Sequence, residues 1–589
     1  MKKEHNFQQI SIQGSKVIGL IMLLFLSVTT AFSQGGGASG GQPDRMFQVA
    51  ETKIVWDSIV PDEATRILLS PKILKAANIY PNSTVSTFDL DVAMSKILAI
   101  PDVARVKIDI EMLSGNQVII ILKVKPGKKP EDYTGKTGVF SSGKRKEFPT
   151  LYQDDHSYVK FHLAGNITPT LMNNTWWGNG KTFTEFNPYG KNPPGAGDVI
   201  STDGYLIAGI SGITRIIKGS KPLYVYGSVK ALGVGTFGDE LYNAGSNTFK
   251  LQVEEFFAGV VGAHTTATGD LIRYNISIGK QPYKIGNGML ICQIAGNGGT
   301  WGGINSWPRF AGKLVGIAQV VVNKMKFEGF YIEPNEYENN TSETKLAGIN
   351  AEYNNSYGLS GGLTYLNVLN SKFPYFFPDL TQTSRKGLNA FNLRGQWTPR
   401  PNESFLFVKA EGGLQINSKI PMTEYGNAIE GGWSFGTLKT RPSISYRFAL
   451  LTGDDPATSR FERWDILYSG DDMTTWVQGP LMKNILFNSN LETSRFQLQL
   501  FPSGWRLTTQ YSFFMANQLN TLPSPAVVTF TEKHIAQELT FIIERFISKN
   551  LYVRMMGTSL WAGKGIAARL PEPIEKPWKE FVIMLKFSI

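Results

Sequence analysis

The chain has 589 residues, a formal net charge of +11, 42% apolar residues and a mean hydropathy of −0.14. One cysteine and five histidines argue against a disulfide framework, a thiolate metal cluster or a histidine-rich metal site, so we expect no metal and no cofactor. The basic balance favours an anionic partner. The aromatic content of 12% and the 60 glycines are typical of a strand-rich wall, which could belong to a soluble sandwich or to a membrane barrel.

Residues 1–33 have the features of a secretory signal peptide. Lysines at positions 2, 3 and 16 provide the positive region, and residues 17–28 (VIGLIMLLFLSV) form a short apolar core. Ala31-Phe32-Ser33 is a small-x-small cleavage site before Gln34. The apolar core is shorter than the roughly 20 residues of a membrane-spanning helix. We therefore expect an exported protein with a flexible mature N-terminus over residues 34–49.

Residues 50–127 have the pattern of a small α/β domain. We expect Pro71 to break or restart the first helix, and Pro101 to follow the end of the second. Gly115-Asn116 is a turn signal between two apolar runs. In chain order, the expected elements are a strand over 53–60, a helix over 63–78, a helix that begins at residue 87, and strands over 104–112 and 117–124.

This β-α-α-β-β order resembles the polypeptide-transport-associated (POTRA) domain. The matching stretches are FDLDVAMSKILAIPDVARVKIDIEM and the ending GNQVIIILKVKP, which is similar to the last strand of such domains before a barrel. The resemblance implies a periplasmic domain that binds a partner, and a sheet edge could bind an extended chain by β-augmentation. A generic α/β plug domain would show the same order of elements. The polar, lysine-rich residues 128–150 are expected to form a linker.

From residue 151 to residue 589 short alternating runs are separated by turns. Phe496, Leu498 and Leu500, for example, alternate with polar residues before a turn at Pro502-Ser503-Gly504. This alternation is typical of a membrane β-barrel with apolar residues outward. Long polar loops are expected at residues 166–197 and 335–344. We predict a mainly β fold, with an antiparallel transmembrane barrel of about 16–20 strands and 18 as the central value.

The C-terminal strand supports a membrane barrel over a soluble sandwich. Its alternate residues are apolar up to the end of the sequence: Phe581, Ile583, Leu585, Phe587 and Ile589. A strand of this kind closes an outer-membrane barrel and resembles the signal read by the barrel-assembly machinery. Such signals usually end in an aromatic residue, and Ile589 departs from that pattern.

Two stretches resemble the alginate-export family of outer-membrane channels. The first is LIRYNISIGKQPYKIGNGMLI over residues 271–291, where Lys280 stands at a position that usually holds arginine. The second is residues 441–479, where Gly453, Asp454 and Asp465 match the family's Gly-Asp turn and aromatic loop. The resemblance implies passive export of an acidic polysaccharide through the outer membrane. That family has no POTRA domain, so the N-terminal part departs from it.

Strand alternation assigns basic side chains to the lumen. If Ile272, Tyr274 and Ile276 face lipid, Arg273 between them points inward. The same rule places six arginines in the lumen, and with Lys280 the expected channel-lining residues are Arg273, Lys280, Arg394, Arg447, Arg495, Arg506 and Arg554. Guanidinium groups suit carboxylates because they bind them in a bidentate manner. The alternative is that these arginines are paired with wall carboxylates such as Glu328 and Glu352.

Two other functions stay open beside an anion channel. A POTRA-bearing insertase or translocase would carry a Val/Leu-Arg-Gly-aromatic motif in a lumen loop, and the nearest match, residues 393–396 (LRGQ), lacks the aromatic residue. A plugged structural or adhesive barrel would use its outer loops instead. No catalytic residues stand out, so we do not expect an enzyme. The expected partners are outer-membrane lipid and lipopolysaccharide, the barrel-assembly machinery, an anionic polysaccharide and a periplasmic protein at residues 50–127, but no nucleic acid.

Overall fold

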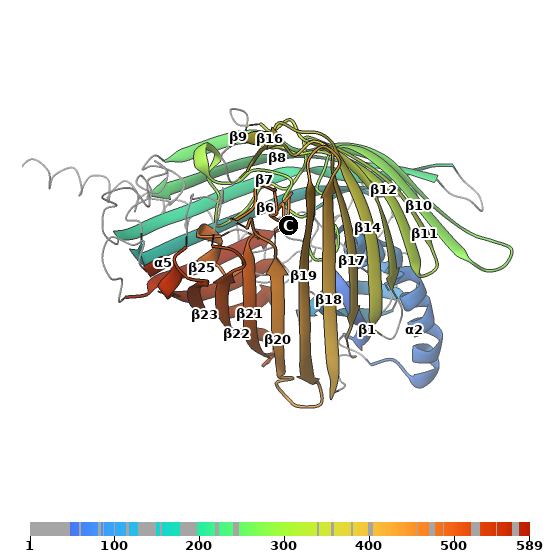
Figure 1. Cartoon of the computed structure of the whole chain (residues 1–589). Coiled ribbons are helices and arrows are strands. Elements are labelled where there is room, and N and C mark those ends of the chain that lie inside the picture. Colours follow the sequence, from blue (N-terminus) through green and yellow to red (C-terminus); the bar gives the residue numbers. More distant parts are fainter. Residues whose placement is uncertain are drawn as a thin grey trace, which may run out of the picture.

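In the computed structural model the chain forms a closed antiparallel β-barrel that is preceded by a small α/β unit (Figure 1). The described residues lie between 47 and 127 and between 149 and 589, with gaps. The longer gaps are residues 128–148, 177–196, 218–222, 239–246, 399–403, 471–477, 520–529 and 568–575. The expected signal peptide, most of the expected flexible N-terminus and most of the expected linker therefore lie outside the described residues.

The N-terminal unit pairs its strands in the order β2-β1-β4-β3, with β1 parallel to β4 and β3 antiparallel to β4. The expected helices and last two strands are present, and a short strand, β2, lies between the helices. The first strand begins and ends earlier than predicted. The elements are β1 (Phe47–Trp56), α2 (Glu63–Ala77), β2 (Thr84–Val85), α3 (Thr87–Leu98), β3 (Val103–Met112) and β4 (Gln117–Pro126).

Helix α2 runs through Pro71 without a break, which corrects the prediction that this proline divides it. Leu69, Ile73 and Ala77 recur every fourth residue and are buried against the sheet and α3. Proline removes one helical hydrogen bond and crowds the preceding turn. Burial of these three side chains, which lie on both sides of Pro71 in the sequence, offsets the destabilisation by proline. The sequence periodicity alone does not show how much burial the helix gains.

Truncation of Ile73 to alanine is expected to destabilise the N-terminal unit by about 2–5 kcal/mol, because the side chain is fully buried. Ile67, which is 65% exposed on the opposite face of α2, is the matched control, and its truncation should change little. Hydrogen exchange of the α2 amides in the full chain under increasing urea measures both changes. Equal effects of the two truncations would contradict this packing.

Eighteen described strands form the closed wall, as the sequence predicts. The first half of the wall comprises β6 (Ser157–Thr175), β7 (Gly197–Ile217), β8 (Leu223–Gly238), β9 (Thr248–Thr265), β10 (Leu271–Lys280), β11 (Leu314–Val322), β12 (Met325–Glu333), β13 (Lys345–Asn354) and β14 (Leu359–Asn370). The second half comprises β17 (Leu388–Trp397), β18 (Ser404–Asn417), β19 (Met422–Phe435), β20 (Ser443–Leu451), β21 (Leu491–Leu500), β22 (Trp505–Ala516), β23 (His534–Ser548), β24 (Leu551–Ala562) and β25 (Trp578–Ser588).

Smaller elements lie outside this wall. The short strand β5 (Thr150–Gln153) pairs with the beginning of β6. A hairpin of β15 (Pro374–Phe376) and β16 (Gln382–Ser384), the turns η1 (Gly299–Trp301) and η2 (Met482–Asn484), and α5 (Lys564–Ala567) occur in the connections. None of the described helices has both the length and the apolar character that a membrane-spanning helix needs.

The last strand closes the barrel. β25 pairs antiparallel with β6, and Ile589 exchanges backbone hydrogen bonds with Leu163, including a 2.8 Å bond from its own N–H. Phe581 is exposed on the outer face, whereas Val582 is buried on the inner face. The C-terminal residues therefore have the structural role that their alternation predicts. Whether they are also an assembly signal stays a prediction.

The polar residues 166–175 belong to strand β6, which corrects the prediction of a loop that begins at Asn166. Asn166, Thr168 and Thr170 occupy alternate inward positions of this strand. Even Pro169 is paired, opposite Thr202. An inner barrel face that is polar gives a sequence pattern similar to that of a loop, and for this reason the strand was missed.

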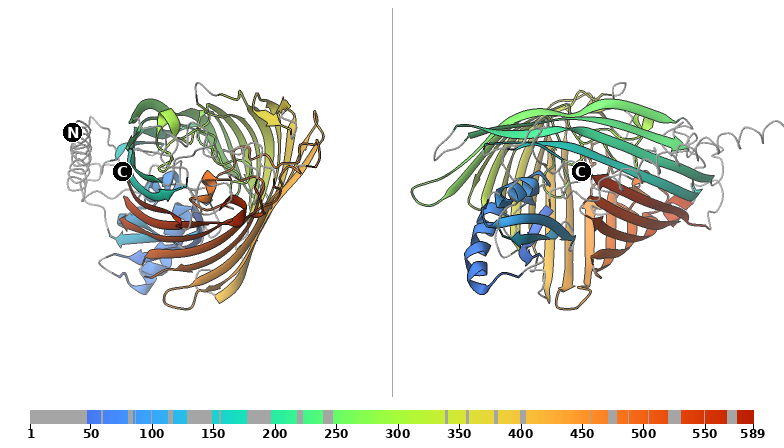
Figure 2. Two further views of the ribbon diagram at one scale, coloured as in Figure 1. Left: turned by 60° about the vertical axis from the view of Figure 1, so that its left-hand side comes forward. Right: turned by 180° about the vertical axis from the view of Figure 1, so that it is seen from behind.

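The two ends of the barrel differ. At one end the turns are short: β11 ends at Val322 and β12 begins at Met325. At the other end β10 ends at Lys280 and β11 begins only at Leu314, and the connection from β20 to β21 is similarly long. The N-terminal unit lies at the end with the short turns (Figures 1 and 2), where Glu111 forms an ion pair with Arg441 of the β19–β20 turn.

Candidate functional site: the barrel lumen

The wall has an apolar outer face and a more polar inner face. On β17, Phe391 and Leu393 are 41% and 67% exposed, whereas Ala390, Asn392 and Arg394 between and beside them are buried. The same outward exposure recurs in β10, β13 and β21, at Ile276, Ile349 and Phe496. A continuous band of exposed apolar side chains around a closed barrel is typical of a wall that is surrounded by lipid.

Two long connections fold into the barrel and pack against its inner face. The described parts of residues 281–313 and 452–490 contribute to one buried core, together with inward residues of the wall. Met289, Ile291, Trp464 and Leu481 from these connections are each no more than 1% exposed. Ile291 and Tyr468 form a parallel bridge that joins the two connections. The half of the lumen at the long-loop end is therefore narrowed by a folded, partly apolar constriction.

Three wall carboxylates anchor this constriction through backbone N–H groups. Asp203 of β7 accepts from the N–H groups of Asn305 and Ser306 at 2.7 and 3.1 Å. Glu254 of β9 accepts from Phe310 and Ala311 at 2.7 and 2.9 Å. Glu538 of β23 accepts from Leu481 and Met482, both at 3.0 Å. Each of these side chains accepts from two successive backbone N–H groups, so together they fix both connections to the wall.

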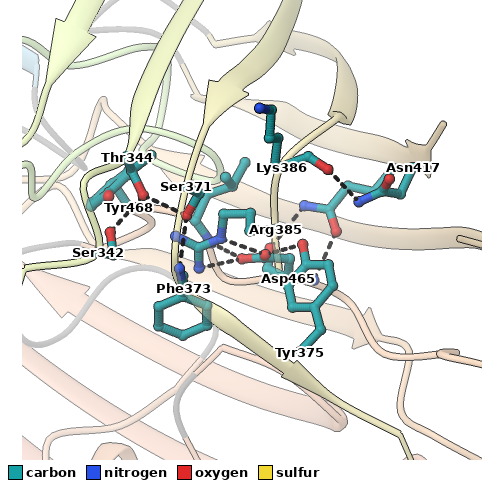
Figure 3. A network of polar contacts seen from close by, with 12 residues as sticks. Ser342, Thr344, Ser371, Phe373, Tyr375, Arg385, Lys386, Asn417, Asp465 and Tyr468 are labelled. Atoms are coloured by element: carbon teal, nitrogen blue, oxygen red, sulfur yellow. Dashed lines mark hydrogen bonds and ion pairs between the residues drawn. The ribbon is translucent and has the colours of Figure 1, made fainter. Parts of the chain in front are cut away.

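Arg385 and Asp465 form the centre of a buried network at the long-loop end (Figure 3). The Arg385 Nε and one terminal nitrogen donate to the two Asp465 oxygens at 2.7 and 2.8 Å, and Tyr375 also donates to this carboxylate. Burial and the Asp465 charge raise the pKa of Tyr375 well above its usual value. Burial acts against the Arg385 charge, but Asp465 nevertheless raises the pKa of that guanidinium. The network joins the β15–β16 hairpin to the connection 452–490.

A row of four charged residues crosses the inner face of neighbouring strands β18 to β21. Lys409 is paired with Glu430, Glu430 with Arg447, and Arg447 with Arg495 in the strand register. Directly paired residues have Cα atoms about 4.5–5.5 Å apart. The Arg447 Nε donates to Glu430 at 2.9 Å. We call Lys409, Glu430, Arg447 and Arg495 the charged row; it contains three cations and one carboxylate.

Two further arginine clusters lie on the inner face. Arg506 and Arg554 are both buried against Glu544, with N–O distances of 2.5 and 2.8 Å. Arg394 donates to Glu352 at 2.6 Å and also to Asn350 and Thr364. These arginines are therefore paired with carboxylates. Glu352 is one of the two wall carboxylates that the sequence analysis named as alternative arginine partners. Glu328 instead accepts a 2.7 Å bond from Tyr283 of the constriction.

The remaining expected lining residues lie in different places. Arg273 takes an inward register position on β10 and is exposed. Lys280 is paired in register with Phe256, and its ammonium donates to the carbonyl of Val253 at 2.5 Å, so its place in the channel lining stays a prediction. Strand β10 ends at Lys280, so alternation no longer determines the direction of the side chain.

The residues of the family-like loop are structural parts of the constriction. Asp465 is the partner of Arg385, and Asp454 forms a 2.9 Å ion pair with Arg463. Burial raises the pKa of Asp454. At Gly453 a Cβ atom would lie 1.8 Å from the Asn490 side chain, so a larger residue cannot be accommodated there without movement. The motif therefore maintains the shape of a loop inside the barrel.

The sequence analysis did not identify the anchors Asp203, Glu254 and Glu538, nor Lys409 and Glu430 of the charged row. The available signal was a charged residue at an inward position of a strand. Carboxylates and lysines at inward positions carry the same information.

Comparisons with known proteins give a likeness in overall fold. No protein-family model matches the chain, and no curated protein matches it. Among solved structures, OpdL of Pseudomonas aeruginosa aligns with a TM-score of 0.43 and 8% identity over 73% of this chain and 98% of OpdL. The outer membrane protein OprD of the same organism gives 0.39 and 10% over 73% and 93%, and OccAB1 of Acinetobacter baumannii gives 0.42 and 11% over 73% and 96%.

Proposed function

We propose that the protein is an outer-membrane channel that conducts anionic solutes. The observation that carries this proposal is the charged row, in which three cations and one carboxylate lie on the inner face of adjacent strands. A lumen lined by fixed charge of one sign concentrates and orients ions of the other sign. The exposed apolar outer face supports a membrane location, and short turns are typical of the periplasmic end.

The proposed solute is a carboxylate-bearing molecule, with an acidic polysaccharide as the largest candidate. Arg447 and Arg495 are direct neighbours in the strand register without a carboxylate between them. Arg447 donates to Glu430, and Arg495 places a second guanidinium beside it. Guanidinium groups suit a carboxylate because they have parallel N–H donors. The resemblance of residues 271–291 and 441–479 to the alginate-export family supports the polymer. Lipopolysaccharide, the barrel-assembly machinery and a periplasmic partner of the N-terminal unit remain proposed partners.

The buried core inside the barrel favours one second candidate, a plugged structural or adhesive barrel. In that case residues 281–313 and 452–490 would close the lumen permanently, as their packing against the wall allows. The translocase hypothesis gains no support from Arg394. This arginine lies in wall strand β17 and pairs with Glu352, whereas the translocase motif belongs to a loop.

Single-channel recording in planar bilayers, with and without an acidic oligosaccharide, tests the channel against the plug. If the protein is a channel, we expect a steady current. The acidic oligosaccharide should block this current, whereas a neutral oligosaccharide of equal length should not. A steady current that neither sugar blocks would reject the polymer but retain the channel. The absence of any current from correctly folded protein would reject the channel and favour the plug.

A further inference from the structure

Exposed lysines follow the edge of the barrel at the long-loop end of strands β11 to β18, which are neighbours in the wall. Each lysine lies at the end of a strand or within two residues of it. Because adjacent strands are about 4.8 Å apart, the group extends over roughly 24 Å of this edge. We call these residues the basic rim; they are Lys313, Lys345, Lys372, Lys386 and Lys419.

Carboxylates neutralise only part of the basic rim. Lys345 lies 3.3 Å from Glu333, and Lys372 forms an ion pair with Glu343. Neither of the two lysines at the β17 and β18 ends of the rim forms an ion pair with a carboxylate that the structure describes. The rim therefore keeps an excess of positive charge, and this excess is greatest at β17 and β18.

Lys386 and Lys419 lie beside each other at the ends of these two strands. The N–H of Ser418 donates to the carbonyl of Gly387 at 3.3 Å, and the Asn417 side chain donates to the carbonyl of Lys386 at 3.4 Å. The Lys386 side chain points away from the buried network at this end of the barrel (Figure 3). Like charges at neighbouring strand positions repel each other. An anion bound between the two ammonium groups would therefore stabilise both.

Exposed apolar side chains of the outer face lie next to the basic rim. Leu369 precedes Lys372 by three residues, and Ile416 precedes Lys419 by three. These two apolar side chains are 49% and 37% exposed. Three residues of extended chain span at most about 11 Å, so the apolar surface begins close to the ammonium groups. An apolar wall that ends in a basic rim fits a lipid, whose acyl chains would contact the wall while its anionic headgroup contacts the lysines.

We propose that the basic rim binds the phosphate groups of an outer-leaflet glycolipid of the lipopolysaccharide class, with Lys386 and Lys419 as its main contacts. A lysine ammonium suits phosphate because it is a compact point charge with three donors. The inference rests on the proposed outer-membrane location, in which the short turns are periplasmic and the long-loop end faces outward. It assigns a lipid site to the outer edge of the barrel, separate from the charged row in the lumen.

Binding of fluorescently labelled lipopolysaccharide to the full, detergent-purified protein tests this site. The double variant Lys386→Gln with Lys419→Gln removes two charges and breaks no described ion pair, and it should bind about 10- to 30-fold more weakly than the wild type. Lipopolysaccharide without its phosphate groups should bind the wild type as weakly as the intact lipid binds this variant. The matched control, Lys72→Gln with Lys75→Gln, removes two exposed charges from α2 and should behave as the wild type.

Equal binding of the lipid by the wild type and the rim variant would overturn the inference, as would an equal loss in the α2 control or tight binding of the lipid without phosphate. Inorganic phosphate that binds the wild type as tightly as the lipopolysaccharide would assign the lysines to soluble anions and reject the lipid. Bilayer recordings separate this inference from the proposed channel. A protein that binds the lipid through the rim but passes no current would contradict the channel alone. A conducting protein whose rim variant binds the lipid normally would contradict the lipid site alone.

Discussion

Replacement of Arg385 by methionine is expected to lower the free energy of unfolding by about 3–5 kcal/mol, because it leaves the Asp465 charge buried and unpaired. Both side chains of the pair are only 2% exposed, and the two N–O distances are 2.7 and 2.8 Å. Tyr375 would still donate to Asp465, but a neutral donor cannot replace the cation. Urea unfolding of the protein in lipid vesicles measures the loss.

Two further variants separate the ion pair from its surroundings. The double variant Arg385→Met with Asp465→Leu should recover most of the lost stability, because apolar residues of similar volume can replace a buried ion pair. The neighbouring Lys386→Met is the matched control and should have little effect. A single Arg385→Met variant as stable as the wild type would contradict the buried pair.

Opposite changes in ion selectivity are expected from two neighbouring positions of the charged row. Arg495→Gln should lower the ratio of anion to cation permeability, and Glu430→Gln should raise it, each by roughly fivefold. Two unit charges 4 Å apart in water interact with about 1 kcal/mol, and this energy corresponds to a roughly fivefold change in the permeability ratio. The reversal potential in a salt gradient across a planar bilayer reports the ratio.

The opposite changes in the permeability ratio serve as the control in this experiment. General damage to the fold would change the ratio in the same direction in both variants. Glu352→Gln provides a comparison outside the row, where the carboxylate is already paired with Arg394 and Lys326. Changes of the same sign in Arg495→Gln and Glu430→Gln would contradict a selective role for the row.

Strand alternation was sufficient to predict the barrel, its strand number and the inward position of several arginines. The period-2 pattern of β17, with Leu393 outward and Arg394 inward, is dictated by backbone geometry and by lipid on one side only. Alternation failed where the inner face was polar, at residues 166–175. There the polar inward residues Asn166, Thr168 and Thr170 resemble the composition of a loop.

The interior of the barrel could not be predicted in the same way. Asp465 and Arg385 are 80 residues apart in sequence, and Glu538 accepts from amides 56 and 57 residues away. Such contacts depend on the way in which the two long connections fold back into the lumen. A local sequence pattern does not determine that folding. The same limitation explains why the loop motif at Gly453, Asp454 and Asp465 was recognised while its structural role was not.

The reversal potential of the wild-type protein in a potassium chloride gradient tests the central claim most directly. The charged row predicts a stable current whose reversal potential has the sign of chloride permeation, and a shift toward zero when the salt concentration on both sides is raised, because salt screens fixed charge. A reversal potential with the sign of potassium permeation, or a folded barrel that passes no current, would contradict the proposed anion channel.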